Sequence, residues 1–223
     1  MKILITGING FIGQHLASEL LKKGHYVIGL SRGNKCSIKS ISKYFSGSVL
    51  DKELVTRAIK NVDVVVHLAA LTAHKDIVDN RFKTLETNFL GTQNILNVFS
   101  KSKTTKNFLY ASTGKVYGNI VKLPITETHP TNPLNILGKS KLITEKLIDF
   151  YALATLSTSK KEFVIFRTFN VYGPGQGKNF LIPTIINQLS LNKKEITLGD
   201  IDAKRDYEYY LSETRKLDER EQL

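Results

Sequence analysis

The 223-residue chain contains a single cysteine, Cys36. One cysteine excludes a disulfide within the chain and is typical of proteins in a reducing compartment, so the sequence predicts a cytoplasmic location. No apolar stretch reaches the roughly 20 residues of a membrane-spanning helix, and the N-terminus lacks the layout of a signal peptide, so no membrane partner is expected. Hydrophobic residues still make up 41% of the chain, enough for one good core and a small second lobe.

Acidic residues are also scarce, because 20 Asp and Glu stand against 32 Lys and Arg, a formal net charge of +12. A positive charge of this size raises the question of nucleic-acid binding. The lysines are scattered along the whole chain, however, with no basic helix, no stripe of interleaved aromatic residues and no zinc spacing. The sequence therefore predicts no nucleic-acid partner and no metal site, and a lysine-rich surface that tolerates anionic ligands.

The most informative feature that is present is a glycine-rich turn after the first apolar segment, in which Gly7, Gly10 and Gly13 follow residues 2–6. Such a turn needs a residue without a Cβ, lets backbone amides approach a pyrophosphate, and lets the next helix lie close to its strand. The amphipathic helix expected over residues 11–23 directs its positive end at the phosphates. This order of strand, glycines and helix favours dinucleotide binding over an ordinary glycine turn.

Strands and helices continue to alternate along the chain with short connections. This alternation predicts an α/β fold with a Rossmann-like, doubly wound parallel sheet. The pattern loosens after Gly173-Pro174-Gly175, so we expect an NAD(P)-binding domain over residues 1–172 and a smaller lobe with a charged tail over residues 173–223. Further strands are expected at residues 25–30, 44–49, 62–68, 107–112 and 163–167, and further helices at residues 76–102 and 135–156.

The end of the second strand bears on the choice of cofactor. An NAD-selective dinucleotide fold commonly has an acidic residue there, whereas the 2′-phosphate of NADP is accommodated by an arginine. Ser31 removes the acid and Arg32 supplies the guanidinium. These two residues favour NADP over NAD, and the alternative is that Arg32 is an ordinary solvated loop residue.

Five further segments occur in a characteristic order: Val66-His67-Leu68-Ala69-Ala70, Asn88 within a long helical stretch, Ser112 to Gly118, Gly138 to Lys141, and Arg167 to Pro174. Together with the glycine turn, they resemble the extended short-chain dehydrogenase/reductase family, in particular its nucleotide-sugar epimerase/dehydratase branch. The resemblance covers residues 1–210.

The resemblance implies roles for individual residues on the cofactor side. The three glycines would hold the pyrophosphate of NAD(P), and Lys141 matches the lysine that grips the nicotinamide ribose and lowers the pKa of a catalytic tyrosine. The other residues placed on the cofactor side are Phe11 and Ile12 through their amides, Ser31 and Arg32, Leu68, Ala69 and Ala70 beside the ribose, and Asn88.

The resemblance also implies a nucleotide-sugar substrate. Thr113 matches the catalytic hydroxyl that bonds the reacting sugar oxygen, and the simpler alternative is a strand-end cap. Asn170 and Asn179 match residues that bind the nucleotide diphosphate, and the alternative for both is a turn former. Arg205 matches an arginine directed at the same diphosphate, and the alternative is a surface charge.

The chain departs from the family pattern at the catalytic tyrosine. The family's Tyr-x-x-x-Lys pair lies one helical turn apart, but Leu137 stands four residues before Lys141. A leucine cannot exchange a proton, and general acid–base catalysis typically contributes about 10²–10⁴ in rate. Thr113 and Lys141 are the available stand-ins. The alternative to an enzyme is a non-catalytic NAD(P)-binding pseudoenzyme.

Two further expectations concern the reaction and the assembly. The branch's dehydratases carry an acidic pair after the catalytic threonine, where this chain has Gly114 and Lys115. This leaves hydride transfer at the sugar C4, either 4-epimerisation or reduction of a 4-keto sugar.

The smaller lobe over residues 173–223 would bind the substrate. Family members continue well past the Arg205 motif, so this lobe is expected to be incomplete, as in a truncated member. The two long helices predict a homodimer.

Overall fold

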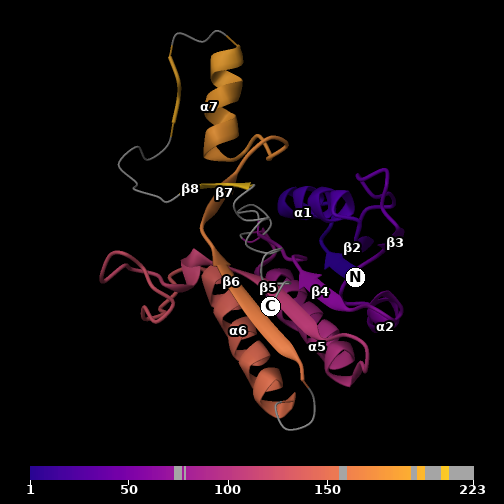
Figure 1. Ribbon diagram of the computed structural model, residues 1–223. Helices are drawn as coiled ribbons and strands as arrows, with labels where there is room; N and C mark the ends of the chain where they lie inside the picture. The colour runs from indigo at the N-terminus through magenta and orange to yellow at the C-terminus, as the bar shows by residue number, and fades with distance from the viewer. Residues whose placement is uncertain (73–76, 78, 156–159, 192–194, 199–206, 211–223) are drawn as a thin grey trace. The chain divides into compact units, whose positions relative to one another are not determined.

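The computed structural model describes residues 1–223 except 73–76, 78, 156–159, 192–194, 199–206 and 211–223 (Figure 1). The chain forms two compact units, Met1–Thr168 and Phe169–Leu223. Among the described residues, no helix has both the length and the apolar character that crossing a membrane requires.

The first unit is built on a six-stranded parallel sheet in the order β3-β2-β1-β4-β5-β6. The chain starts at the centre, builds outward to β3, and then returns to add β4 to β6 on the other side, which is the doubly wound topology that the sequence predicted. The strands are β1 (Lys2–Thr6), β2 (Tyr26–Ser31), β3 (Lys43–Ser46), β4 (Val64–His67), β5 (Asn107–Thr113) and β6 (Glu162–Thr168).

Helices cover the sheet, and their apolar sides explain why it forms. The described helices of this unit are α1 (Phe11–Lys22), α2 (Lys52–Ile59), α4 (Arg81–Leu85), the π-helical η1 (Glu86–Leu90), α5 (Gly91–Lys101), the 3₁₀ turn η2 (Gly114–Val116) and α6 (Ile136–Thr155). Leu4 and Val65 of the sheet pack in one core with Phe99, Phe108 and Ile148. Strands covered in this way need continuous apolar runs, and every residue of β4 is buried.

The structure departs from the predicted elements at three places. The strand predicted over residues 44–49 is too long, because β3 ends at Ser46. Helix α2 was not predicted, although Asp51 marks its start by accepting hydrogen bonds from the amides of Glu53 and Leu54, both at 3.0 Å. The single helix predicted over residues 76–102 is wrong, because the backbone leaves the helical conformation at Asn80, with φ −140° and ψ 63°, and α4 and α5 are joined by the π turn η1. Residues 76 and 78 of the predicted range lie outside the described residues. A π turn inserts an extra residue without ending the helix, and apolar periodicity cannot reveal it.

The second unit is smaller and contains a two-stranded parallel sheet, β7 (Asn170–Tyr172) with β8 (Tyr207–Tyr209), and the helix α7 (Leu181–Ser190). Aromatic side chains gather along the two strands, since the ring of Tyr172 lies 6.4 Å from that of Tyr207 and 5.4 Å from that of the exposed Tyr209. The assignment of residues 1–172 to the cofactor and 173–223 to the substrate stays a prediction.

Candidate functional site

The carboxyl ends of β1, β2 and β4 meet at Gly7. Its backbone φ of +73° lies in the left-handed region that favours glycine. The Gly7 amide donates to the Leu30 carbonyl of β2 at 2.7 Å, and a Cβ at Gly7 would lie 2.8 Å from the Ala69 nitrogen. Only glycine therefore permits these strand ends to approach so closely, and they surround the point where the strand order reverses.

The other two glycines have different surroundings. A Cβ at Gly13 would lie 2.6 Å from the Gly7 carbonyl oxygen, so this glycine lets α1 lie against the turn. Gly10 is exposed, and a Cβ there would meet only the Gly7 oxygen, at 3.0 Å. No side chain caps the N-terminus of α1, which begins at Phe11. The turn thus offers an open approach at Gly10 beside the positive end of a helix, as a bound pyrophosphate requires.

His67 fixes the end of β4 through a buried chain of hydrogen bonds. Thr92 must donate to the Asn88 carbonyl at 2.6 Å, so its oxygen accepts from His67 Nε2 at 2.9 Å. His67 Nδ1 is then an acceptor from the Thr6 hydroxyl at 2.6 Å, and that hydroxyl accepts from the Ala69 amide at 3.2 Å. Burial lowers the pKa of His67 to about 3, which keeps the ring neutral.

Asn88 and the predicted ribose-side segment are joined by the same network. The buried Asn88 side chain accepts from the Leu71 amide at 2.8 Å and donates to the Leu71 carbonyl at 3.2 Å. It also donates to Ser140 of α6 at 3.2 Å. Asn88 therefore links the π turn to α6 and to the segment that follows β4. The half-buried residues of that segment are Leu68, Ala69 and Ala70.

Thr113 ends β5 and caps the next turn, because its hydroxyl oxygen accepts from the Lys115 amide at 3.3 Å. Thr113 therefore has the structural role of a strand-end cap, which was the simpler alternative for this residue. An accepting hydroxyl still has its proton to donate, so the cap does not exclude a contact with a substrate oxygen. Its catalytic role stays a prediction.

Leu137 and Lys141 lie one turn apart on α6, and both are buried. The Lys141 ammonium donates to the Ala111 carbonyl at 2.5 Å and lies 4.5 Å from the centre of the Tyr110 ring. Burial lowers the pKa of Lys141 to about 7, against the opposing charge of Glu145. Tyr110 is buried, which raises the pKa of its phenol and closes it off from a substrate, so it does not replace the missing catalytic tyrosine.

An ion pair between the buried Glu145 and the half-buried Arg167 was missed in the sequence. Glu145 accepts from the Ser112 hydroxyl and from Arg167, whose Nη2 lies 2.8 Å from Glu145 Oε2. Hydrogen bonding to Glu145 raises the pKa of Arg167. Because Ser112 and Arg167 are register partners on β5 and β6, the pair fixes these strand ends directly before Thr113. The sequence did hold a signal for this ion pair, because Arg167 lies within the largely apolar strand β6 and a partly buried arginine needs a partner.

The predicted diphosphate-binding residues belong to the second unit or are not described. Asn170 is half-buried in β7, and Asn179 is exposed. Arg205 lies outside the described residues. At the adenosine end, Ser31 is half-buried at the end of β2 and Arg32 is exposed. The binding roles of these residues stay predictions.

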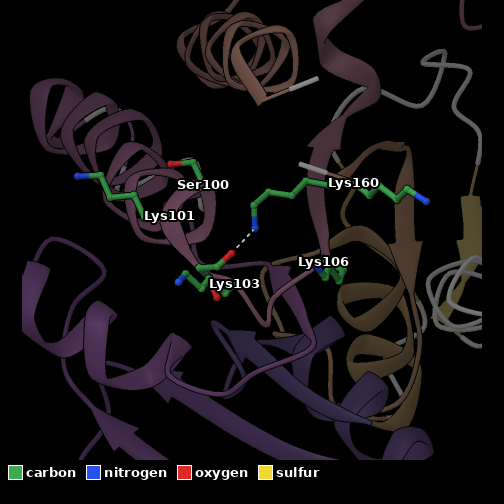
Figure 2. Close-up of a pocket in the computed structure, with 7 residues that line it drawn as sticks. Ser100, Lys101, Lys103, Lys106 and Lys160 are labelled. Carbon is green, nitrogen blue, oxygen red and sulfur yellow. Dashed lines mark hydrogen bonds between the residues drawn. The ribbon is translucent and has the colours of Figure 1, made fainter. Parts of the chain in front are cut away.

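A separate hollow lies at the other end of the strands, before β5 and β6 (Figure 2). It is lined by Ser100, Lys101, Ser102, Lys103, Lys106, Lys160 and Lys161. Figure 2 shows Lys101 and Lys160 extending in opposite directions, so their ammonium groups do not converge on one point. None of the predicted site residues lines it.

Comparison with known proteins adds a family model, described as the NAD dependent epimerase/dehydratase family, which matches residues 3–210. A dTDP-D-glucose 4,6-dehydratase of Dictyostelium discoideum is 36% identical over 236 residues, with 93% of this chain and 52% of the relative covered. The chain therefore spans about half the length of that relative.

Solved structures agree with the fold. The UDP-glucose 4-epimerase of Thermotoga maritima, solved with UDP-glucose, has a TM-score of 0.85 and 28% identity, covering 96% of this chain and 71% of its own. The UDP-glucuronic acid 4-epimerase of Bacillus cereus, solved with UDP-glucuronic acid and NAD, has a TM-score of 0.84 and 29% identity, covering 98% and 72%. These likenesses confirm the predicted Rossmann-like fold.

Proposed function

The chain belongs to the NAD dependent epimerase/dehydratase family, and from this premise we propose that it binds NAD(P) and a nucleotide sugar and supports hydride transfer at the sugar C4. The reaction is of the UDP-sugar 4-epimerase or 4-keto-sugar reductase type. One observation carries the proposal: the glycine turn lies where the strand order reverses, with an open approach at Gly10. Relatives and structural neighbours with this fold are nucleotide-sugar enzymes.

The residues around the turn fit a dinucleotide. Gly7, Gly10 and Gly13, with the amides of Phe11 and Ile12, would hold the pyrophosphate. Leu68, Ala69 and Ala70 would border the nicotinamide ribose, and Asn88 would support them from behind. We propose NADP as the preferred form, because the end of β2 offers an exposed arginine, Arg32, and no acidic side chain. The single cysteine favours a reducing compartment, and we propose the cytoplasm.

A bound nicotinamide dinucleotide supplies the chemistry of hydride transfer. Thr113 would donate its hydroxyl proton to the reacting sugar oxygen. With a pKa of about 7, Lys141 is partly deprotonated at neutral pH and can hold or release a proton there. Asn170, Asn179 and Arg205 would bind the diphosphate of the nucleotide sugar. Gly114 and Lys115 supply no acidic pair for removal of a 6-hydroxyl.

A second candidate function is a non-catalytic NAD(P)-binding protein. The observation that favours it is the buried side chain of Leu137 at the position of the catalytic tyrosine. In addition, the Lys141 ammonium is already directed at the Ala111 carbonyl. In this alternative the cofactor site is retained while the proton shuttle is lost.

Hydride exchange separates the two candidates. We would mix the protein with NADP⁺, NAD⁺ or their reduced forms and a panel of UDP- and dTDP-linked hexoses, uronic acids and 4-keto sugars, and follow nicotinamide absorbance and sugar products. Sugar-dependent turnover supports the enzyme. Dinucleotide binding by calorimetry without turnover supports the non-catalytic protein, and no dinucleotide binding contradicts both.

A further inference from the structure

Asn9 lies inside the glycine turn, yet its side chain is directed at a different loop. Its Nδ2 donates to the Lys35 carbonyl at 2.9 Å and to the Tyr44 hydroxyl at 3.2 Å. Its Oδ1 accepts from the amide and the hydroxyl of Ser37, at 3.1 and 3.2 Å. A side-chain amide has two donor protons and two acceptor positions, so the hydrogen-bonding capacity of Asn9 is fully used.

Tyr44 of β3 holds the beginning of the same loop. Its hydroxyl accepts from Asn9 and donates to the Gly33 carbonyl, with the Ser31 carbonyl 3.2 Å away. A tyrosine is protonated at neutral pH, and burial raises the pKa of Tyr44 further, so its hydroxyl has a proton to donate. A Cβ at Gly33 would lie 3.0 Å from Asn9 Nδ2, which shows how closely the loop approaches the turn.

We propose that Asn9 and Tyr44, together called the clamp, fix the loop of residues 31–37 against the glycine turn and thereby set the selectivity for NADP(H) over NAD(H). The inference rests on the proposed function. Arg32 lies between Ser31 and Gly33, the two residues whose carbonyls face the Tyr44 hydroxyl. Its backbone is therefore fixed while its side chain remains exposed.

A fixed backbone matters because a guanidinium binds a phosphate through directional, paired hydrogen bonds. An arginine on a loop that is already ordered loses less conformational freedom when it binds the 2′-phosphate. NAD(H) lacks that phosphate, so it gains less from the order of the loop. Asn9 is a positioning residue in this scheme and makes no contact with the dinucleotide through its side chain.

The first test compares dinucleotide affinities by titration calorimetry at one salt concentration. Asn9→Ala removes the whole amide, and Tyr44→Phe removes a single hydroxyl. Both variants are expected to lose about tenfold in affinity for NADP⁺ and about threefold or less for NAD⁺, so that the ratio of the two dissociation constants shifts toward NAD⁺.

The chain offers a matched control at a distance from the loop. Tyr151 donates to Asn97 Oδ1 at 2.5 Å and joins α6 to α5. Asn97→Ala and Tyr151→Phe make the same chemical changes at this second asparagine–tyrosine pair. Both control variants are expected to keep the dissociation constants and their ratio within about twofold of the natural protein.

The second test needs no dinucleotide. Arg32 and Lys35 lie in the clamped loop, so trypsin cleavage after them reports how often the loop opens. With the sites mapped by mass spectrometry, cleavage is expected to be about tenfold faster in the clamp variants and unchanged in the controls. Should Asn9→Ala fail to fold, Tyr44→Phe alone decides.

The outcomes separate the two proposals. Dinucleotide binding by the natural protein with an unchanged NADP⁺/NAD⁺ ratio in both clamp variants overturns the clamp and leaves the proposed function standing. A natural protein that binds neither dinucleotide overturns the proposed function, whatever trypsin reports. A natural protein that binds NAD⁺ more tightly than NADP⁺ overturns the assigned selectivity.

Discussion

At the scale of single residues, Leu137 decides between an enzyme and a pseudoenzyme. It lies one turn before Lys141 on α6, where a phenol would stand beside a cation. We expect the natural protein to show little or no turnover with nucleotide sugars and Leu137→Tyr to gain measurable turnover. The introduced phenol would have a pKa lowered by the Lys141 ammonium and would act as general base near neutral pH.

The matched control for this change is Leu137→Phe, which adds the same ring without the hydroxyl. A gain in Leu137→Tyr that Leu137→Phe does not share belongs to the proton shuttle and not to repacking. Turnover by the natural chain at ordinary enzyme rates, on the order of 1–10³ s⁻¹, would contradict the pseudoenzyme alternative. Thr113 or Lys141 would then be the working acid–base group.

The buried ring of His67 is expected to make the free energy of unfolding depend on pH in the acid range. Its pKa is about 3 in the folded chain against 6.5 for the free side chain, so between these values only the unfolded state binds the proton. The free energy of unfolding therefore falls as the pH falls through this window, by at most about 1.4 kcal/mol per pH unit from this residue. His67→Asn should cost about 1–3 kcal/mol at pH 7, because one threonine loses its partner.

His67→Asn lacks the titrating ring, so the difference in the free energy of unfolding between the natural protein and this variant should shrink from pH 7 to pH 4. Urea unfolding at several pH values measures it. Curves of stability against pH that stay parallel for the natural protein and His67→Asn would show that the ring is not held neutral.

At the scale of elements, a substitution in the glycine turn is expected to affect dinucleotide binding more than stability. Gly10→Val places a branched side chain at the exposed approach to the N-terminus of α1, where the pyrophosphate would lie. We expect the affinities for NADP(H) and NAD(H) to fall by about tenfold or more, while the free energy of unfolding falls by only about 1 kcal/mol, because valine is a poor N-cap residue. Lys22→Val, at the other end of α1, is the control and should leave both affinities unchanged. Equal dinucleotide binding by Gly10→Val would place the cofactor elsewhere.

The elements also show what a sequence can and cannot predict. Apolar runs such as Val64–His67 predict buried parallel strands, because burial on both faces leaves little choice of residue. The spacing of the glycines predicts the turn, because a Cβ at Gly7 or Gly13 would collide with neighbouring backbone. The supporting pairs were not predictable: Asn9 meets Tyr44 across 35 residues, and Glu145 meets Arg167 across 22. Such pairs depend on strand register and side-chain direction, which local patterns do not contain.

At the scale of the whole molecule, exposed apolar side chains on two helices point to an assembly. On α6, Phe150 is 66% and Leu153 is 68% exposed, and on α4, Phe82 is 90% exposed. Figure 1 shows α6 along the side of the first unit, and α4 and η1 both contact it. Apolar surface gains about 25 cal/mol per Å² when removed from water, so these exposed side chains favour a partner.

We expect that partner to be a second copy of the chain, joined through these helices as in a four-helix bundle. Sedimentation at micromolar concentration should give twice the monomer mass of 25.1 kDa. Phe150→Asp combined with Leu153→Asp places two carboxylates in the interface, where desolvation opposes association, and should give monomers. Val121→Asp is the control, because Val121 is 80% exposed but lies outside both helices. A natural protein that sediments as a monomer, or a dimer that survives the double change, would contradict assembly through this face.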